Sequence, residues 1–125
     1  MSNENVESLK RGAAAWNDGD FDGWIANLDP EVEWHALMEV YRGHAGARQL
    51  WDNFKEMELT IEFVDVRDLG ECVLGMGEIK AQGQATGLDL SSEIAQLATF
   101  RDGKVVTFRD FGTHAEGLEA AGLSE

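Results

Sequence analysis

Residues 15–35 of the chain, AWNDGDFDGWIANLDPEVEWH, hold three successive structural signals. Gly19 suits the left-handed residue that follows a helix, and Asp20 can cap a second, short helix. That helix must end near Pro30, because the residue before a proline avoids helical angles. Residues 31–37 then alternate between apolar and polar side chains, which predicts a half-buried strand. The segment therefore predicts helix, helix and strand in close succession.

Helix and strand patterns continue on both sides of this segment. Upstream, apolar side chains recur at three- and four-residue spacing and predict a first helix: Val6, Leu9, Ala13 and Trp16. Downstream, residues 41–44 are expected to form a loop and residues 45–57 a third helix. Strand-like segments follow at 59–68, 71–82, 88–100 and 104–111, with spacers at 69–70, 83–87 and 101–103, and residues 116–123 suggest a short terminal helix. The last spacer holds Asp-Gly, which is typical of a hairpin.

The expected order is α-α-β-α-β-β-β-β followed by a short C-terminal helix. Long antiparallel strands after three helices predict an α+β fold in one domain, residues 1–125. The helices can cover only part of one sheet face. The remainder of the concave face therefore forms a pocket or packs on a partner.

Composition excludes several classes of function. The net charge is −14 and the ten Lys and Arg residues are scattered, so nucleic acid and anionic membranes should be repelled. No apolar run approaches the roughly 20 residues that span a bilayer, and the polar N-terminus does not resemble a secretory signal. The single cysteine, Cys72, rules out an internal disulfide. We expect a cytoplasmic protein.

Metal binding is not expected. His35, His44 and His114 lie on different predicted elements and form no ligand motif, whereas divalent sites need three or four converging ligands. Cys72 has no evident neighbouring base, which argues against a nucleophile. We expect neither a metal nor a cofactor.

Three sequence segments, in this order along the chain, resemble the SnoaL-like branch of the nuclear transport factor 2-like superfamily: residues 15–35, YRGHAGARQLW at 41–51, and DGKVVTFRDFGTHAEGLEAAGL at 102–123. The resemblance implies a cone-shaped half-barrel, a curved antiparallel sheet with three helices packed on it, around one apolar pocket. It leaves activity open, because this superfamily includes isomerases, cyclases, epoxide hydrolases, dehydratases, transport factors and non-enzymatic binders.

The family geometry implies that the concave sheet face lines the pocket. Alternation then assigns three sets of residues to that face: Val106, Phe108 and Asp110; Ser92, Ile94, Gln96, Ala98 and Phe100; Val73, Gly75, Gly77, Ile79 and Ala81. The two glycines are expected to leave room for a cavity. The ligand-binding candidates are Trp34, Phe108, Ile94, Gly77 and Ile79.

Asp110 is the main catalytic candidate. The resemblance places it where SnoaL-like cyclases and limonene-epoxide-hydrolase-like enzymes carry an aspartate on the final strand. A carboxylate on an apolar wall is costly to ionise, so its pKa should rise toward the range useful for acid/base work. The alternative is a rim aspartate paired with Arg42 or Arg109. Gln96, Tyr41 and His35 are polar groups that could converge with it, and Gln96 and Tyr41 are the candidate donors.

The known catalytic constellations are incomplete here. Gln96 stands where the related cyclases present a histidine. Gly77 and Ile79 stand where epoxide hydrolases of this fold use an arginine and an aspartate. The three ketosteroid isomerase positions correspond to Gly12, Trp34 and Gln96. These departures put each of those activities in doubt.

Two functions remain open. The first is an acid/base enzyme without a cofactor, of isomerase, cyclase or lyase type, acting on a small apolar carbonyl compound. The second is a non-catalytic binding or accessory protein that keeps the pocket; a protein adaptor is a weaker third. Apolar side chains on the outer sheet face predict a homodimer through that face: Leu74, Met76, Ala95, Leu97 and Phe111.

Overall fold

The structure is a computed structural model that describes residues 2–55, 57–82 and 89–123. The predicted spacer at 83–87 lies outside the described residues, as does residue 88, the expected start of the third late strand. Four helices are described: α1 (Ser2–Asp18), α2 (Phe21–Ile25), α3 (Gly43–Lys55) and α4 (His114–Ala120). None of these helices is long and apolar enough to cross a membrane.

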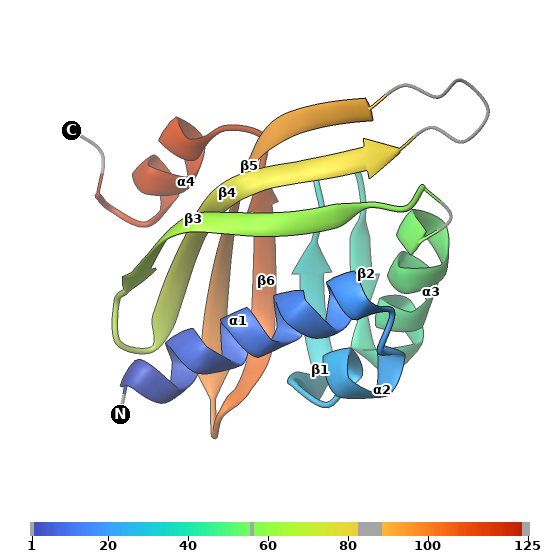
Figure 1. The fold of residues 1–125 in the computed structure, drawn as a ribbon. Coiled ribbons are helices and arrows are strands. Elements are labelled where there is room, and N and C mark those ends of the chain that lie inside the picture. Colours follow the sequence, from blue (N-terminus) through green and yellow to red (C-terminus); the bar gives the residue numbers. More distant parts are fainter. Residues whose placement is uncertain (1, 56, 83–88, 124–125) are drawn as a thin grey trace.

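Six strands form one curved, open sheet: β1 (Leu28–His35), β2 (Val40–Arg42), β3 (Thr60–Asp68), β4 (Cys72–Gln82), β5 (Asp89–Arg101) and β6 (Lys104–Phe111). Their order in the sheet is β2-β1-β6-β5-β4-β3, and neighbours are antiparallel except for β1 and β6, which run parallel. The predicted α+β fold is confirmed. Figure 1 shows α1 crossing the sheet in front of the strands, with α2 and α3 near β1 and β2.

The turn after α1 follows the predicted chemistry. Gly19 adopts a φ of 75°, and the Asp20 carboxylate accepts a hydrogen bond of 3.0 Å from the Gly23 amide at the start of α2. These two residues set the angle between α1 and α2 and so bring Trp16 and Trp24 into edge contact, with ring centroids 5.3 Å apart.

The predicted loop at 41–44 is wrong. Val40–Arg42 forms β2, which pairs with β1 so that Tyr41 lies opposite Trp34, and α3 begins at Gly43. Gly43 has a φ of 68°, which lets the chain turn directly from strand into helix. The tight connection places Tyr41 inside the core.

One alternation in β6 also fails. The register between β5 and β6 shifts after Thr99, which pairs with Thr107, because Phe100 pairs with Val105. Val106 falls in this irregularity, a β-bulge, and Val105 takes its place on the buried face with 3% of its surface exposed. The prediction that Val106 shares the pocket face with Phe108 is therefore wrong.

The sheet separates two apolar clusters. The larger lies on the concave face beneath α1, α2 and α3 and includes all four tryptophans. The smaller lies on the outer face, where α4 packs against β4, β5 and β6 and covers Leu74, Met76, Ala95 and Leu97. The outer-face side chains that were predicted to form a dimer contact, Leu74, Met76, Ala95, Leu97 and Phe111, are thus buried or partly buried within a single chain. The homodimer itself stays a prediction.

Candidate ligand pocket and its carboxylate

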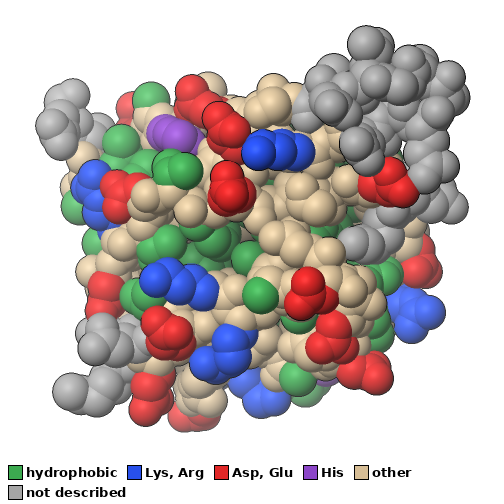
Figure 2. Space-filling view, viewed as in Figure 1, with side chains coloured by type: hydrophobic (Ala, Val, Ile, Leu, Met, Phe, Trp, Pro, Cys, Tyr) green, Lys and Arg blue, Asp and Glu red, His purple; other side chains and the backbone are tan. Residues whose placement is uncertain are grey.

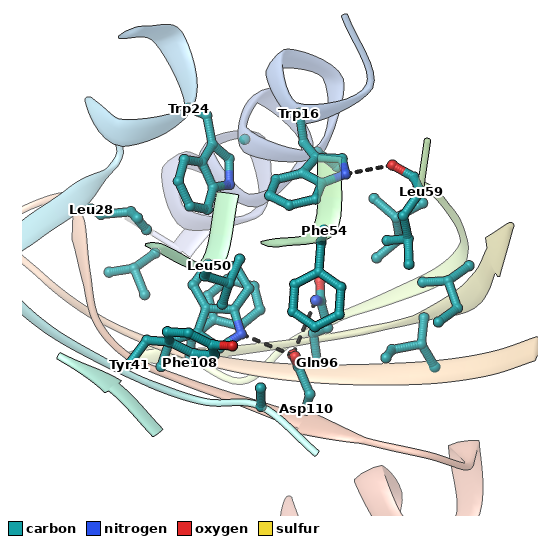
Figure 3. Close-up of a pocket in the computed structure, with 18 of the residues that line it drawn as sticks. Trp16, Trp24, Leu28, Tyr41, Leu50, Phe54, Leu59, Gln96, Phe108 and Asp110 are labelled. Carbon is teal, nitrogen blue, oxygen red and sulfur yellow. Dashed lines mark hydrogen bonds between the residues drawn. The ribbon is translucent and has the colours of Figure 1, made fainter. Parts of the chain in front are cut away.

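A cavity of about 300 Å³ lies between the concave sheet face and the helices. Its wall is mainly apolar, and six aromatic side chains contribute to it: Trp16, Trp24, Trp34, Tyr41, Phe54 and Phe108. Figure 3 shows Trp16 and Trp24 facing Asp110 across the space, with the rings of Tyr41, Phe54 and Phe108 also around it. A concave, mostly apolar cavity with few polar groups is the usual form of a small-molecule site.

Asp110 supplies the carboxylate of this wall. Trp34 donates a hydrogen bond of 3.0 Å from Nε1 to Oδ2, and Gln96 donates one of 3.1 Å from Nε2 to Oδ1. Gln96 lies directly opposite Asp110 in the β5–β6 register. Trp34 reaches it from β1, where its ring stacks on Phe108 at 4.0 Å. The sheet therefore fixes both oxygens of the acid.

Burial raises the pKa of Asp110 to about 6, although the hydrogen bonds from Trp34 and Gln96 lower it in part. Among the described residues that line the cavity, none is Lys, Arg or His, so no cation offsets the loss of water. Each carboxylate oxygen has two lone pairs, so two hydrogen bonds leave capacity to accept a proton. The arrangement can act as a base near neutral pH.

The alternative of a rim aspartate paired with arginine does not occur. Arg42 instead pairs with Glu33 at 2.6 Å, and Arg109 lies over the Phe111 ring. His35 also binds Glu33, at 3.1 Å, and does not line the cavity. Figure 2 shows acidic and basic side chains interspersed on one face of the molecule.

Most predicted site residues do line the cavity: Asp110, Gln96, Tyr41, Trp34, Phe108, Ile94 and Ile79. The Tyr41 hydroxyl oxygen accepts a hydrogen bond of 3.3 Å from Asn53. The catalytic and binding roles of these residues stay predictions.

Gly77 is the exception. It does not line the cavity, because a Cβ there would overlap the Glu62 carbonyl and the Phe63 backbone of β3. Gly75 likewise faces the Phe63 ring and the Leu9 side chain. The prediction that these glycines open the cavity is wrong: their missing side chains allow close packing of β3 and α1.

The histidines have other contacts. His44 Nε2 lies 2.9 Å from the Leu28 carbonyl, and His114 Nε2 lies 2.8 Å from that of Gly77. Within residues 2–55, 57–82 and 89–123, no group of three His, Cys, Asp or Glu residues is placed to hold a metal.

Sequence reasoning missed the helical wall of the cavity. Ser8 and Asn27 contribute polar groups there, and Leu50 and Phe54 close it from α3. Ser8, Gly12 and Trp16 follow one another at four-residue spacing, so a common helical face was detectable. That this face meets the concave sheet depends on the tertiary arrangement.

Comparison with known proteins places this fold among described families. The profile of the SnoaL-like domain matches residues 9–108. An uncharacterised PhzA/B-like protein of Pseudomonas aeruginosa is 28% identical over 114 residues, which cover 84% of this chain and 81% of that protein. A solved nuclear transport factor 2-like protein of unknown function from Burkholderia pseudomallei has a TM-score of 0.81 and 20% identity, covering 95% and 97% of the two chains. TerC, co-crystallised with polyporic acid, has a TM-score of 0.80 and 21% identity, covering 93% and 96%.

Proposed function

The chain belongs to the SnoaL-like domain family, within the nuclear transport factor 2-like superfamily, and we propose that it is an acid/base enzyme acting on a small apolar carbonyl compound without a cofactor. The observation that carries this proposal is Asp110, a carboxylate in an apolar cavity whose pKa is raised to about 6. Such a group is mostly ionised at pH 7 and is a stronger base than an ordinary aspartate.

The proposed reaction begins with proton abstraction. An Asp110 oxygen takes a proton from the carbon next to the carbonyl; the C–H electron pair forms a carbon–carbon double bond, and the π pair of the carbonyl moves to its oxygen to give an enolate. Gln96 has a second amide hydrogen and Tyr41 a hydroxyl hydrogen, so either can donate to that oxygen. Return of the proton to another carbon gives isomerisation, attack on a second carbonyl gives cyclisation, and loss of a β substituent gives a lyase reaction.

The cavity favours a neutral substrate. Asp110 and Glu39 are the charged residues among its described lining, and no cationic side chain joins them there. An anionic ligand would meet like charge in a poorly solvated space. TerC, which shares the fold, was co-crystallised with polyporic acid, which supports an organic small molecule as the class of ligand.

The test is the exchange of hydrogen for deuterium beside the carbonyl of a simple neutral ketone. 1-Tetralone carries an exchangeable CH₂ group beside its carbonyl, and NMR in D₂O follows the loss of that signal. Wild type should accelerate exchange above buffer, with a rate that rises with pH around a midpoint near 6 because the ionised acid is the base. Asp110→Asn should lose about 100-fold or more of the acceleration. Asp102→Asn, in the exposed β5–β6 turn, is the matched control.

A binding protein without catalysis is the second candidate. The observation that favours it is that both Asp110 oxygens already accept hydrogen bonds, from Trp34 and Gln96. Saturable binding of 1-tetralone with an exchange rate equal to buffer would establish this function and overturn the enzyme proposal.

A further inference from the structure

The cavity has a second polar group on its helical wall. Ser8, in α1, is 3% exposed and donates a hydrogen bond of 3.3 Å from Oγ to Oδ1 of Asn27. Asn27 in turn donates from Nδ2 to the Gly23 carbonyl at 3.0 Å. Both Ser8 and Asn27 line the cavity. The acid/base chemistry of Asp110 uses neither residue.

The pair has hydrogen-bonding capacity left for a ligand. The Ser8 oxygen keeps lone pairs after donating its proton, and Asn27 Nδ2 has a second hydrogen. Together they offer one acceptor and one donor. A hydroxyl group both donates and accepts, so it matches this pair, whereas a carboxylate would only accept and would find no cation in the described lining.

The pair lies at the opposite end of the strand from the acid. The Asn27 carbonyl accepts a hydrogen bond of 2.9 Å from the Val105 amide, near the start of β6. Asp110 is five residues further along the same strand, which corresponds to at most about 16 Å. A ligand that reaches from the acid to this pair therefore spans at most about 16 Å.

We infer that Ser8 and Asn27 form a distal subsite for a hydroxyl group on a neutral, elongated carbonyl compound whose α carbon lies at Asp110 and whose carbonyl oxygen lies at Gln96 or Tyr41. The orientation of the ligand rests on the proposed function. The subsite favours carbonyl compounds that have a hydroxyl group at the end of the molecule remote from the carbonyl. Ser8 is buried and donates one hydrogen bond of 3.3 Å, so a ligand hydroxyl would give it a second hydrogen bond.

The experiment compares three ligands by calorimetric titration at pH 6.5: 1-tetralone, 6-hydroxy-1-tetralone and 6-methoxy-1-tetralone. The hydroxyl is para to the carbonyl carbon and can both donate and accept, whereas the methoxy group can only accept. Wild type should bind the hydroxy compound about tenfold more tightly than 1-tetralone, as expected for one good neutral hydrogen bond. The methoxy compound should show no such gain.

Ser8→Ala should reduce the ratio of the two dissociation constants, that of 1-tetralone divided by that of the hydroxy compound, from about ten to about one. Ser92 was predicted on the pocket face, but it is exposed on β5 and does not line the cavity. Ser92→Ala is therefore the control and should keep the tenfold ratio. A purely structural link between α1 and α2 would change stability and leave this ratio at tenfold. If Ser8→Ala does not fold, the hydroxy-against-methoxy comparison in wild type still decides.

Equal binding of all three ligands by wild type, or a tenfold ratio retained in Ser8→Ala, overturns the subsite. Hydroxyl selectivity without hydrogen exchange keeps the subsite and removes only the catalytic proposal. Absence of binding by all three compounds overturns the ligand class on which both proposals stand.

Discussion

Trp34 donates a 3.0 Å hydrogen bond from its indole nitrogen to Asp110 while its ring stacks on Phe108, so one side chain both builds the pocket wall and holds the acid. We expect Trp34→Phe to keep the stacking and remove the hydrogen bond. Because that bond favours the ionised carboxylate, the pKa of Asp110 should rise further above about 6. Carbon-13 NMR titration of the Asp110 carboxyl measures the change.

Phe111→Leu, on the opposite face of β6, is the control for this titration and should leave the Asp110 midpoint in place. An unchanged or lower pKa in Trp34→Phe would mean that the indole does not stabilise the ionised form. The pH midpoint of tetralone exchange should move in the same direction as the NMR midpoint.

Asp110 should also make stability depend on pH. Its pKa is about 6 in the folded chain against an ordinary 3.8, so between these values the folded state binds more protons than the unfolded state. The free energy of unfolding therefore falls as pH rises through this window, by at most about 3 kcal/mol, and the penalty remains above pH 6. Asp110→Asn lacks this group and should be more stable than wild type at pH 7.5, with the difference shrinking toward pH 4.

Urea unfolding at pH 4, 6 and 7.5 measures this difference. Asp102→Asn, whose side chain is exposed in the hairpin turn, controls for loss of one acidic residue from a chain of net charge −14. A stability difference between Asp110→Asn and wild type that is the same at all three pH values would contradict a raised pKa.

The strand part of the site could be predicted because alternation is a local property. Ile94, Gln96, Phe108 and Asp110 follow from counting residues along β5 and β6, and the structure places all four on the cavity wall. The same counting failed at Val106, because a bulge adds one residue to β6 and shifts the faces beyond it. Bulges arise from pairing with a neighbouring strand, which a single strand's pattern does not contain.

The covering elements were harder to predict. Ser8 and Trp16 have helical periodicity, yet the spacing along α1 does not specify which sheet face the helix covers. The outer apolar residues of β4 and β5 predicted a dimer contact, which stays a prediction, but their packing against α4 of the same chain was not predicted. Contacts between elements far apart in sequence decide both points.

The two inner-face glycines of β4 give a graded test of packing. Gly77→Ala places a Cβ against the β3 backbone, which cannot move easily, and should cost about 3 kcal/mol or more. Gly75→Ala meets the Phe63 ring at 2.6 Å and the Leu9 side chain at 3.0 Å, which can shift, and should cost about 1–2 kcal/mol. Urea unfolding ranks the two variants.

Gly12→Ala is the control for this pair. Gly12 lies within α1, and the nearest atom to its added Cβ is Asn27 Nδ2 at 3.8 Å, so the change should be neutral or stabilise by up to about 1 kcal/mol. If the glycines instead opened the cavity, Gly75→Ala and Gly77→Ala would weaken tetralone binding without loss of stability.

Gly117 lets α4 approach the outer face of the sheet closely. A Cβ there would overlap the Ala95 side chain and lie 3.3 Å from Leu74. We expect Gly117→Val to lift α4, to cost about 2–4 kcal/mol, and to expose the apolar residues beneath it. Increased fluorescence of the dye ANS and concentration-dependent sedimentation beyond that of wild type would report the exposed face.

Gly112→Ala is the control. The nearest atom to its added Cβ is Glu116 Oε1 at 3.8 Å, so neither dye fluorescence nor sedimentation should change. Stability and dye binding equal to this control would show that α4 does not seal the outer face, and would return that surface to the predicted dimer contact.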